Sequence, residues 1–212
     1  MTFALSRINR LPAAERGITI ADFLVPIRIG ERLSSRARHL ALILLGTLIV
    51  TLSTQVVIPT SPVPFTGQTF AVLLVGGALG FRRAALSLGL YLLIGAVGLP
   101  VFSRGGSGSE FLLGATGGYL VGFVLAAAVV GRLAELGWDR RIGGAVGAML
   151  VGNLLVYAVG APWLAVVTGR TLSEAIEVGV LPFLAWDTLK ILGAAAVFPA
   201  AWWVVGRRPG DR

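Results

Sequence analysis

The stretch Leu181-Pro-Phe-Leu-Ala-Trp-Asp-Thr-Leu-Lys-Ile-Leu192, followed by apolar residues as far as Val205, indicates the fold class of this protein. An apolar run of roughly 20 residues matches the ~30 Å of hydrocarbon in a membrane. Of the 212 residues, 56% are hydrophobic and 13% are charged, and the mean hydropathy is +0.85. About a quarter of the residues in a soluble domain are charged. The sequence therefore predicts an all-α integral membrane protein.

Working outward from that stretch, we find six apolar segments that we interpret as a bundle of six transmembrane helices. We expect this membrane domain at residues 36–206, after a cytoplasmic extension at residues 1–35 that lies on the membrane surface, and before a short tail at residues 207–212. Pro199 is expected to kink the last helix. The predicted spans are Arg38–Ile58, Gln68–Leu79, Ala84–Leu99, Thr116–Leu136, Ile142–Val159 and Pro182–Val205, with a polar connector at Gly160–Val180.

The arginines are distributed unevenly between the two ends of these spans. In a six-span topology one side holds twelve of them and the other side holds only Arg104 and Arg170. Because Lys and Arg are retained on the cytoplasmic side, both termini of this multi-pass cell-membrane protein are predicted to be cytoplasmic. The net charge of +8 is then explained without nucleic acid. The twelve arginines are Arg28, Arg32, Arg36, Arg38, Arg82, Arg83, Arg132, Arg140, Arg141, Arg207, Arg208 and Arg212.

Small residues recur every four positions in the fourth and fifth predicted spans. Such spacing lets helix backbones approach closely in lipid. We interpret these residues as helix-packing positions, while the alternative is that part of the series leaves room for a ligand. The series are Gly114, Gly118 and Gly122; Gly143 and Gly147; and Gly144, Ala148 and Gly152.

Asp187 and Lys190 are charged residues inside the sixth predicted span, and Lys190 is the only lysine of the chain. Residues three apart share a helix face, and at 1.5 Å per residue the two lie about 7–8 Å and about 12 Å from the outer end. Ionisable groups at such depth cost about 2.5–3.5 kcal/mol each and usually face a cavity or one another. We interpret the pair as part of a ligand site; the alternative is an ion pair that only fixes helix packing.

Two irregular segments on the same outer side are candidates for enclosing that ligand. Ile58–Phe65 contains three prolines, and Ser103–Ser109 is rich in glycine, which permits close approach of a small molecule. Asn153, in the middle of the fifth span, is either a ligand contact or a hydrogen-bonding partner of a neighbouring helix. Candidate apolar walls are Phe65, Phe102, Tyr119, Trp163 and Trp186. The predicted substrate contacts are Asp187, Lys190, Tyr119, Asn153, Thr116 and Gly105.

The residues needed for metal binding, for common kinds of catalysis and for ATP hydrolysis are missing from this sequence. Cysteine is absent and His39 is the only histidine, so we predict no metal site, no cofactor and no catalytic residues. No phosphate-binding Gly-x-x-x-x-Gly-Lys-Ser/Thr motif occurs, so energy for any transport would come from partners. An intramembrane enzyme that uses Asp187 and Lys190 in acid–base chemistry is the alternative from another class, and a structural membrane subunit is a third.

Several ordered motifs of this chain resemble the BioY family, the biotin-binding S components of energy-coupling factor vitamin transporters. The resemblance covers about residues 38–205. Its motifs are Ile58-Pro-Thr-Ser-Pro-Val-Pro-Phe-Thr-Gly-Gln-Thr69, Ala71-Val-Leu-Leu-Val-Gly-Gly-Ala-Leu-Gly80 with Arg82-Arg83, Tyr91-Leu-Leu-Ile-Gly-Ala-Val-Gly-Leu-Pro-Val-Phe102, Gly114-Ala-Thr-Gly-Gly-Tyr-Leu-Val-Gly-Phe123 and Asp187-x-x-Lys190.

This resemblance implies a six-helix membrane subunit of the S-component type that captures biotin at its outer face and mediates its uptake. It also implies a transmembrane coupling protein and two cytoplasmic ATPase subunits as partners, with Ala37 and Ala41 as a docking position for the coupling protein. The family's Asp and Lys correspond to Asp187 and Lys190. The closest alternative function is an S component for another vitamin.

Overall fold

The computed structural model describes residues 19–24 and 35–205, so most of the predicted extension at residues 1–35, and the predicted tail at residues 207–212, lie outside the described residues. Helices dominate the described part. The helices are α2 (Ile20–Leu24), α4 (Ser35–Thr54), α5 (Gln68–Leu79), α6 (Phe81–Ala96), α7 (Gly108–Leu113), α8 (Gly117–Glu135), α9 (Ile142–Thr168), α10 (Leu172–Gly179) and α11 (Leu184–Val205). The 3-10 turns are η2 (Ser103–Gly105), η3 (Trp138–Arg140) and η4 (Leu181–Phe183), and the strands are β1 (Val57–Ile58) and β2 (Phe65–Thr66).

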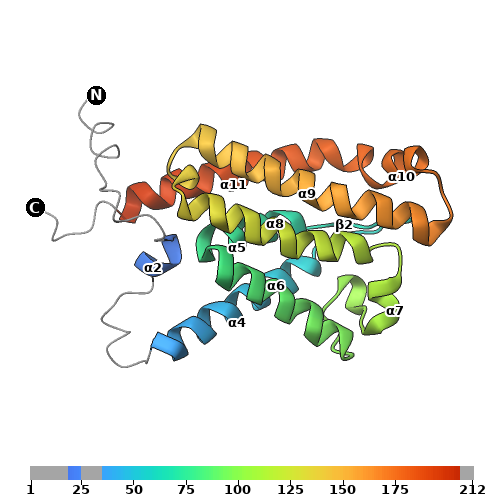
Figure 1. Ribbon diagram of the computed structural model, residues 1–212, viewed down its shortest axis with the longest axis horizontal. Helices are drawn as coiled ribbons and strands as arrows, with labels where there is room; N and C mark the ends of the chain where they lie inside the picture. Colours follow the sequence, from blue (N-terminus) through green and yellow to red (C-terminus); the bar gives the residue numbers. More distant parts are fainter. Residues whose placement is uncertain (1–18, 25–34, 206–212) are drawn as a thin grey trace, which may run out of the picture.

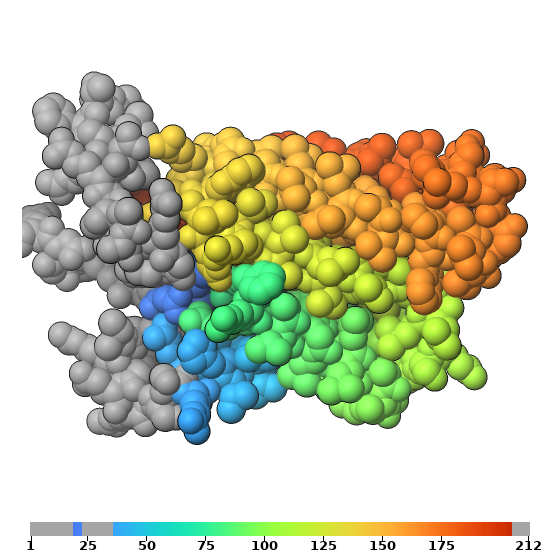
Figure 2. Space-filling model, in the orientation of Figure 1, coloured from blue at the N-terminus to red at the C-terminus, as the bar shows by residue number. Residues whose placement is uncertain are grey.

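The long helices pack side by side around α8, which contacts α5, α6 and α9. In Figure 1 α9 and α11 lie along one side, α4 and α6 along the other, and α5 and α8 between them. The space-filling view shows α9, α8, α6 and α4 following one another across this face (Figure 2). α2 lies at one end of the bundle, while α7 and α10 lie at the opposite end (Figure 1).

The outer surface of the bundle is apolar, as a membrane environment requires. α4 alone exposes Leu40, Leu44, Leu48 and Leu52, each by half or more of its surface. In water such a ridge would be an unfavourable apolar patch, whereas lipid tails cover it. Four segments are long and apolar enough to cross a membrane: Arg36–Thr54, Gly117–Glu135, Ile142–Thr168 and Leu172–Val204. The protein is therefore a multi-pass membrane protein, and α5 and α6 are shorter than these segments.

The fifth predicted span differs most from the structure. α9 continues through Pro162 to Thr168 and ends at Gly169, whose φ of 67° suits glycine. The prediction that the helix ends at Val159 was wrong, because a helix packed against neighbours tolerates a proline. The expected polar connector also contains α10, which begins with a capping box between Thr171 and Glu174.

The first predicted span ends earlier than expected, and its last residues belong to a hairpin. α4 stops at Thr54, and β1 then pairs antiparallel with β2, with Val57 opposite Thr66. The intervening proline segment contains a cis peptide bond between Ser61 and Pro62. The second span, in contrast, has the predicted bounds, Gln68–Leu79. The glycine-rich segment is also more ordered than expected, since α7 begins within it at Gly108.

The small-residue series pack helices together, as predicted, at Gly118, Gly122 and Gly152. A Cβ on Gly118 would lie 2.2 Å from Cβ of Trp163, and one on Gly122 would lie 3.0 Å from Cα of Val156, so α8 and α9 are in direct backbone contact there. Gly152 faces Val130 and Leu73. Four other positions do not contact a neighbouring helix in this way: Gly114 caps α7, a Cβ on Gly143 would meet nothing within 4 Å, and Gly144 and Gly147 face Trp138 of η3.

Part of the predicted N-terminal extension packs on the bundle. α2 contacts α5 and α11, and Ile20 joins the buried cluster that includes Leu73 and Phe198. The backbone N–H and Oγ1 of Thr19 both donate to Oδ2 of Asp22, at 3.1 and 3.0 Å, which closes the first turn of α2. Two buried apolar side chains, Ile20 and Ala21, hold this turn in place.

A buried carboxyl group joins the loop between α8 and α9 to the end of α11. Asp139 is 1% exposed, and Nε1 of Trp202 donates to its Oδ2 at 2.7 Å. Its Oδ1 is buried and has no hydrogen-bond partner among the described residues. Burial raises the pKa of Asp139 to about 6, although the Trp202 hydrogen bond and the Arg140 charge oppose that change.

The raised pKa of Asp139 predicts a stability that declines toward neutral pH. The folded protein favours the protonated form of this carboxyl. The resulting contribution to the free energy of unfolding is complete at a pH below 3.8, the ordinary pKa, and is lost as the pH rises through about 6. We expect the free energy of unfolding of wild type to fall by about 2–3 kcal/mol between about pH 4 and about pH 7, relative to that of Asp139→Asn, whose neutral amide does not titrate. Thermal unfolding of both proteins across this range would measure it, and parallel curves would contradict the assignment.

Candidate ligand-binding site

A cavity of about 540 Å³, counted to its mouth, lies among the β1–β2 hairpin, α8, α9 and the start of α11. The hairpin and this part of the bundle lie away from α2 (Figure 1). The apolar lining consists of Val63, Pro64, Phe111, Leu120, Phe123, Val156 and Phe183. The polar lining consists of Thr66, Gln68, Thr69, Ser103, Thr116, Tyr119, Tyr157 and Lys190.

Among the described residues, Lys190 is the only charged side chain in the wall of this cavity, and two oxygens hold it there. Its Nζ donates to Oδ1 of Asp187 at 2.9 Å and to the backbone oxygen of Thr66 at 3.0 Å. An ammonium group has three donors. Two are occupied by these contacts, so one N–H of Lys190 is left for a ligand in the cavity.

Asp187 lies behind Lys190 and does not itself line the cavity. Its residue is 3% exposed, and its second carboxylate oxygen accepts a hydrogen bond from the hydroxyl of Tyr157 on α9. Both carboxylate oxygens are therefore occupied, one by Lys190 and one by Tyr157. A buried charge is tolerated when it is paired and hydrogen-bonded in this way. The ammonium group of Lys190 balances the negative charge of the Asp187 carboxylate, and the carboxylate in turn sets the position of the ammonium group.

A buried chain of hydrogen bonds fixes the hairpin that supplies the Thr66 oxygen. Oγ1 of Thr66 donates to Oε1 of Gln68 at 3.1 Å, and Nε2 of Gln68 donates to the hydroxyl of Tyr91 at 2.9 Å. The Tyr91 hydroxyl lies 3.3 Å from Oγ1 of Thr54 on α4. Both Tyr91 and Thr54 are fully buried. The position of Lys190 thus depends on α4, α5 and α6 as well as on α11.

Two aromatic stacks lie beside the cavity, and each contributes one ring, Phe183 or Phe111, to the cavity wall. Phe65 stacks on Phe183 with ring centroids 4.2 Å apart, which ties β2 to η4. Phe102 stacks on Phe111 at 5.0 Å and meets Tyr91 edge to face at 5.4 Å. The Phe65–Phe183 pair joins segments far apart in the sequence. Phe65 and Phe102, which were predicted as walls, do not themselves line the cavity.

The structure brings four of the six predicted contacts together. Lys190, Thr116 and Tyr119 line the cavity, and Asp187 is bonded to Lys190. The hydroxyl of Tyr119 donates to the backbone oxygen of Gly179 at 2.9 Å, so its ring rather than its hydroxyl serves as a wall.

The other two predicted contacts lie outside the cavity wall. Asn153 is buried one helical turn before Tyr157, and its Oδ1 has no hydrogen-bond partner among the described residues. Gly105 is exposed, and its φ of 70° places it in the left-handed region, beside the similarly turned Arg104. Of the other aromatic candidates, Trp186 is 52% exposed, and Nε1 of Trp163 donates to the backbone oxygen of Gly114.

The sequence prediction missed Tyr157, Gln68 and Phe183 as parts of the site. Tyr157 is four residues after Asn153 and therefore on the same helix face, and Phe183 precedes Asp187 by four residues. Such spacing was the available signal. The spacing shows which residues share a helix face, but it does not show which other helix that face contacts. For this reason it did not identify these three residues as parts of the site.

The fold and the site define a helical, multi-pass membrane protein with a mostly apolar cavity that holds one ammonium group in its wall. The family model of the BioY family matches residues 28–207. The chain is therefore a member of the BioY family. The family's curated members are named as transporters, so the expectation that the protein is not an enzyme is confirmed.

Relatives and a solved structure agree with this assignment. A biotin transporter BioY from Thermotoga maritima is 37% identical over 155 residues, which cover 71% of this chain and 88% of the relative. The biotin transporter BioY2 of Lactococcus lactis is 36% identical, over 75% of this chain and 87% of the relative. The crystal structure of an S-component for biotin from an ECF-type ABC transporter has the same fold, with a TM-score of 0.73 at 24% identity, over 81% of this chain and 94% of that one.

Proposed function

We propose that the protein binds biotin in the cavity beside Lys190 and mediates its uptake across the cell membrane. The observation that carries this proposal is the ammonium group of Lys190, which is held by Asp187 and Thr66 in the wall of the cavity and has one donor left. Relatives that cover most of the chain are named biotin transporters. An S component for another vitamin is the second candidate.

The cavity suits the chemistry of biotin. Biotin carries a ureido ring with one carbonyl and two N–H groups, an apolar thioether ring and a chain that ends in a carboxylate. Lys190 can donate to the ureido carbonyl or to the carboxylate, and such charge-assisted bonds are stronger than neutral ones. Thr116 and Gln68 offer polar groups to the rest of the ring system, while the Tyr119 and Phe123 rings cover apolar atoms.

We further propose that the bundle crosses the membrane six times, through α4, α5, α6, α8, α9 and α11, with both termini in the cytoplasm. The excess of arginines at the α2 end supports this orientation. The cavity then opens toward the outer side. Energy would come from a transmembrane coupling protein and two cytoplasmic ATPase subunits, with Ala37 and Ala41 on α4 as part of the docking face.

Equilibrium binding of radiolabelled biotin to the purified full-length protein tests this function. We expect saturable binding of one biotin per chain that unlabelled biotin displaces and that riboflavin or thiamine at a hundredfold excess does not. Displacement by another vitamin at lower concentration would favour the second candidate. Uptake of biotin by cells with and without the coupling subunits then tests whether those partners are needed.

A further inference from the structure

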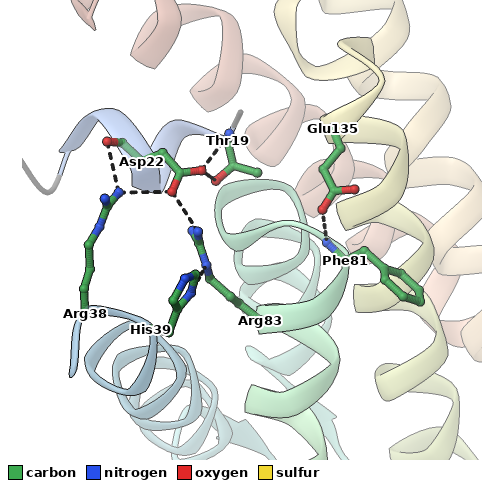
Figure 3. A network of polar contacts seen from close by, with 7 residues as sticks. All are labelled: Thr19, Asp22, Arg38, His39, Phe81, Arg83 and Glu135. Carbon is green, nitrogen blue, oxygen red and sulfur yellow. Dashed lines mark hydrogen bonds and ion pairs between the residues drawn. The ribbon is translucent and has the colours of Figure 1, made fainter. Parts of the chain in front are cut away.

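A second cavity lies at the α2 end of the bundle, on the side opposite to the hairpin. It measures about 1250 Å³ counted to its mouth and is lined by residues of α2, α4, α5, α6 and α8. Three arginines line it, Arg82 and Arg83 on the first turn of α6 and Arg132 on α8, together with the carboxylates of Asp22 and Glu135. Figure 3 shows the polar contacts around it.

Both carboxylates of this cavity are already saturated with donors. Oδ1 of Asp22 accepts from Arg38 at 3.0 Å and from Arg83 at 2.8 Å, while its Oδ2 accepts from Thr19 (Figure 3). Burial raises the pKa of Asp22, but its bonds to Arg83 and Thr19 lower the pKa below the usual value, so it remains charged.

Glu135 is occupied in the same way. Its Oε1 accepts from the backbone N–H of Phe81 at 2.9 Å, and its Oε2 pairs with Arg132 at 3.0 Å. Figure 3 shows the Phe81 contact, where the carboxylate meets the start of α6. Neither acid of the cavity therefore has an oxygen without a donor.

The positively charged side chains beside the cavity carry more N–H donors than the carboxylates of Asp22 and Glu135 can accept. Nη1 of Arg83 is buried and has no acceptor among the described residues. Nε of Arg83 donates to Nδ1 of His39 at 3.0 Å, which leaves the other ring nitrogen of His39 as a donor. Arg82 is exposed and makes no hydrogen bond or ion pair with another described residue. The first turn of α6 adds the positive end of a helix dipole.

The rest of the lining is aliphatic and continues onto the lipid-facing surface. Ile43 and Leu86 line the cavity, and Leu86 is 58% exposed. Leu40 and Leu44 on the neighbouring α4 are exposed to a similar degree. A molecule with an anionic head group and apolar chains matches a basic cavity that continues into an aliphatic surface. Basic pockets between membrane helices on the cytoplasmic side hold anionic lipid head groups in this way.

We propose that this cavity binds the phosphate of an anionic phospholipid, held by Arg82, Arg83 and His39, with its acyl chains along Leu86 and α4. The assignment of that lipid to the inner leaflet rests on the proposed orientation; the binding itself does not depend on biotin. Phosphate oxygens supply the acceptors that Arg83 Nη1 and Arg82 lack. The lipid also fills the space between α4 and α8 at this end of the bundle.

Native mass spectrometry of the delipidated full-length protein, with phosphatidylglycerol and phosphatidylcholine of identical acyl chains, tests this site. We expect one phosphatidylglycerol to bind about thirtyfold more tightly than phosphatidylcholine. Arg82→Gln with Arg83→Gln should remove that preference. Arg82→Gln alone, at an exposed position outside the Asp22 network, should reduce it about fivefold.

The matched control is Arg104→Gln with Arg170→Gln, which removes the same charge at the opposite end and should keep the preference. Equal binding of the two lipids, or an unchanged preference in Arg82→Gln, would overturn the proposal. Displacement of phosphatidylglycerol by an equal concentration of inorganic phosphate would also overturn it and would assign the site to a soluble anion. Biotin binding measured on the same variants should be unchanged, so failure of the biotin function and failure of the lipid site give different results.

Discussion

Replacing Lys190 with methionine is expected to weaken biotin binding by roughly thirtyfold or more. The variant removes the only charged donor in the cavity wall and leaves Asp187 buried with Tyr157 as its remaining partner. Truncating one member of a buried, hydrogen-bonded charge pair costs about 2–5 kcal/mol. Equilibrium binding of radiolabelled biotin to the purified variant gives the value directly.

Thr188→Ala is the matched control for this prediction. Thr188 lies on the same turn of α11, is exposed, and its hydroxyl bonds only the Leu184 oxygen of its own helix. Its affinity for biotin should equal that of wild type. Undiminished binding in the double variant Asp187→Asn with Lys190→Met would refute the site assignment.

The double variant also separates the roles of the two charges. If Asp187 acts by placing Lys190, its replacement should add little once Lys190 is gone, and the two effects should be strongly non-additive. Additive losses would instead indicate that Asp187 contacts biotin itself. The geometry favours the first result, because both oxygens of Asp187 already have protein partners.

Gly118→Ala should have the second large effect, this time on folding. The added Cβ would lie 2.2 Å from Cβ of Trp163 and 2.9 Å from the backbone oxygen of Val159, so α8 and α9 must move apart. Overpacking of this kind costs about 1–3 kcal/mol, which corresponds to a fall of roughly 3–10 °C in the unfolding temperature. Because Tyr119 follows directly and lines the cavity, biotin affinity should fall as well.

Gly143→Ala provides the control for that packing prediction. Gly143 lies on α9, in the same helix pair, but a Cβ there meets nothing within 4 Å. Its unfolding temperature in detergent should stay close to that of wild type, with a small rise from the better helix propensity of alanine. Equal losses in the two variants would show that glycine itself, rather than close packing, sets the stability of this interface.

The helix boundaries show which local signals can be read from a sequence. Gln68–Leu79 was predicted with its observed bounds, since a proline segment precedes it and the charged residues Arg82 and Arg83 follow it. The end of α9 was predicted wrongly, because Gly160–Val180 was interpreted as a polar connector, whereas the helix continues through Pro162 to Thr168. The hairpin after α4 was also missed, since strands of two residues carry almost no periodic pattern.

By itself the sequence determined the membrane class and the BioY resemblance, and it singled out Asp187 and Lys190 as charged residues inside a predicted span. These follow from composition, ordered motifs and the cost of placing charge in lipid, all of which are local properties of the chain. Only the tertiary structure decided that Lys190 lines the cavity while Asp187 stands behind it, that Tyr157 and the Thr66 oxygen hold the pair, and that Gly105 lies outside. Thr66 and Lys190 are 124 residues apart. Contacts over such a separation depend on how helices pack, which the spacing of residues within one helix does not encode.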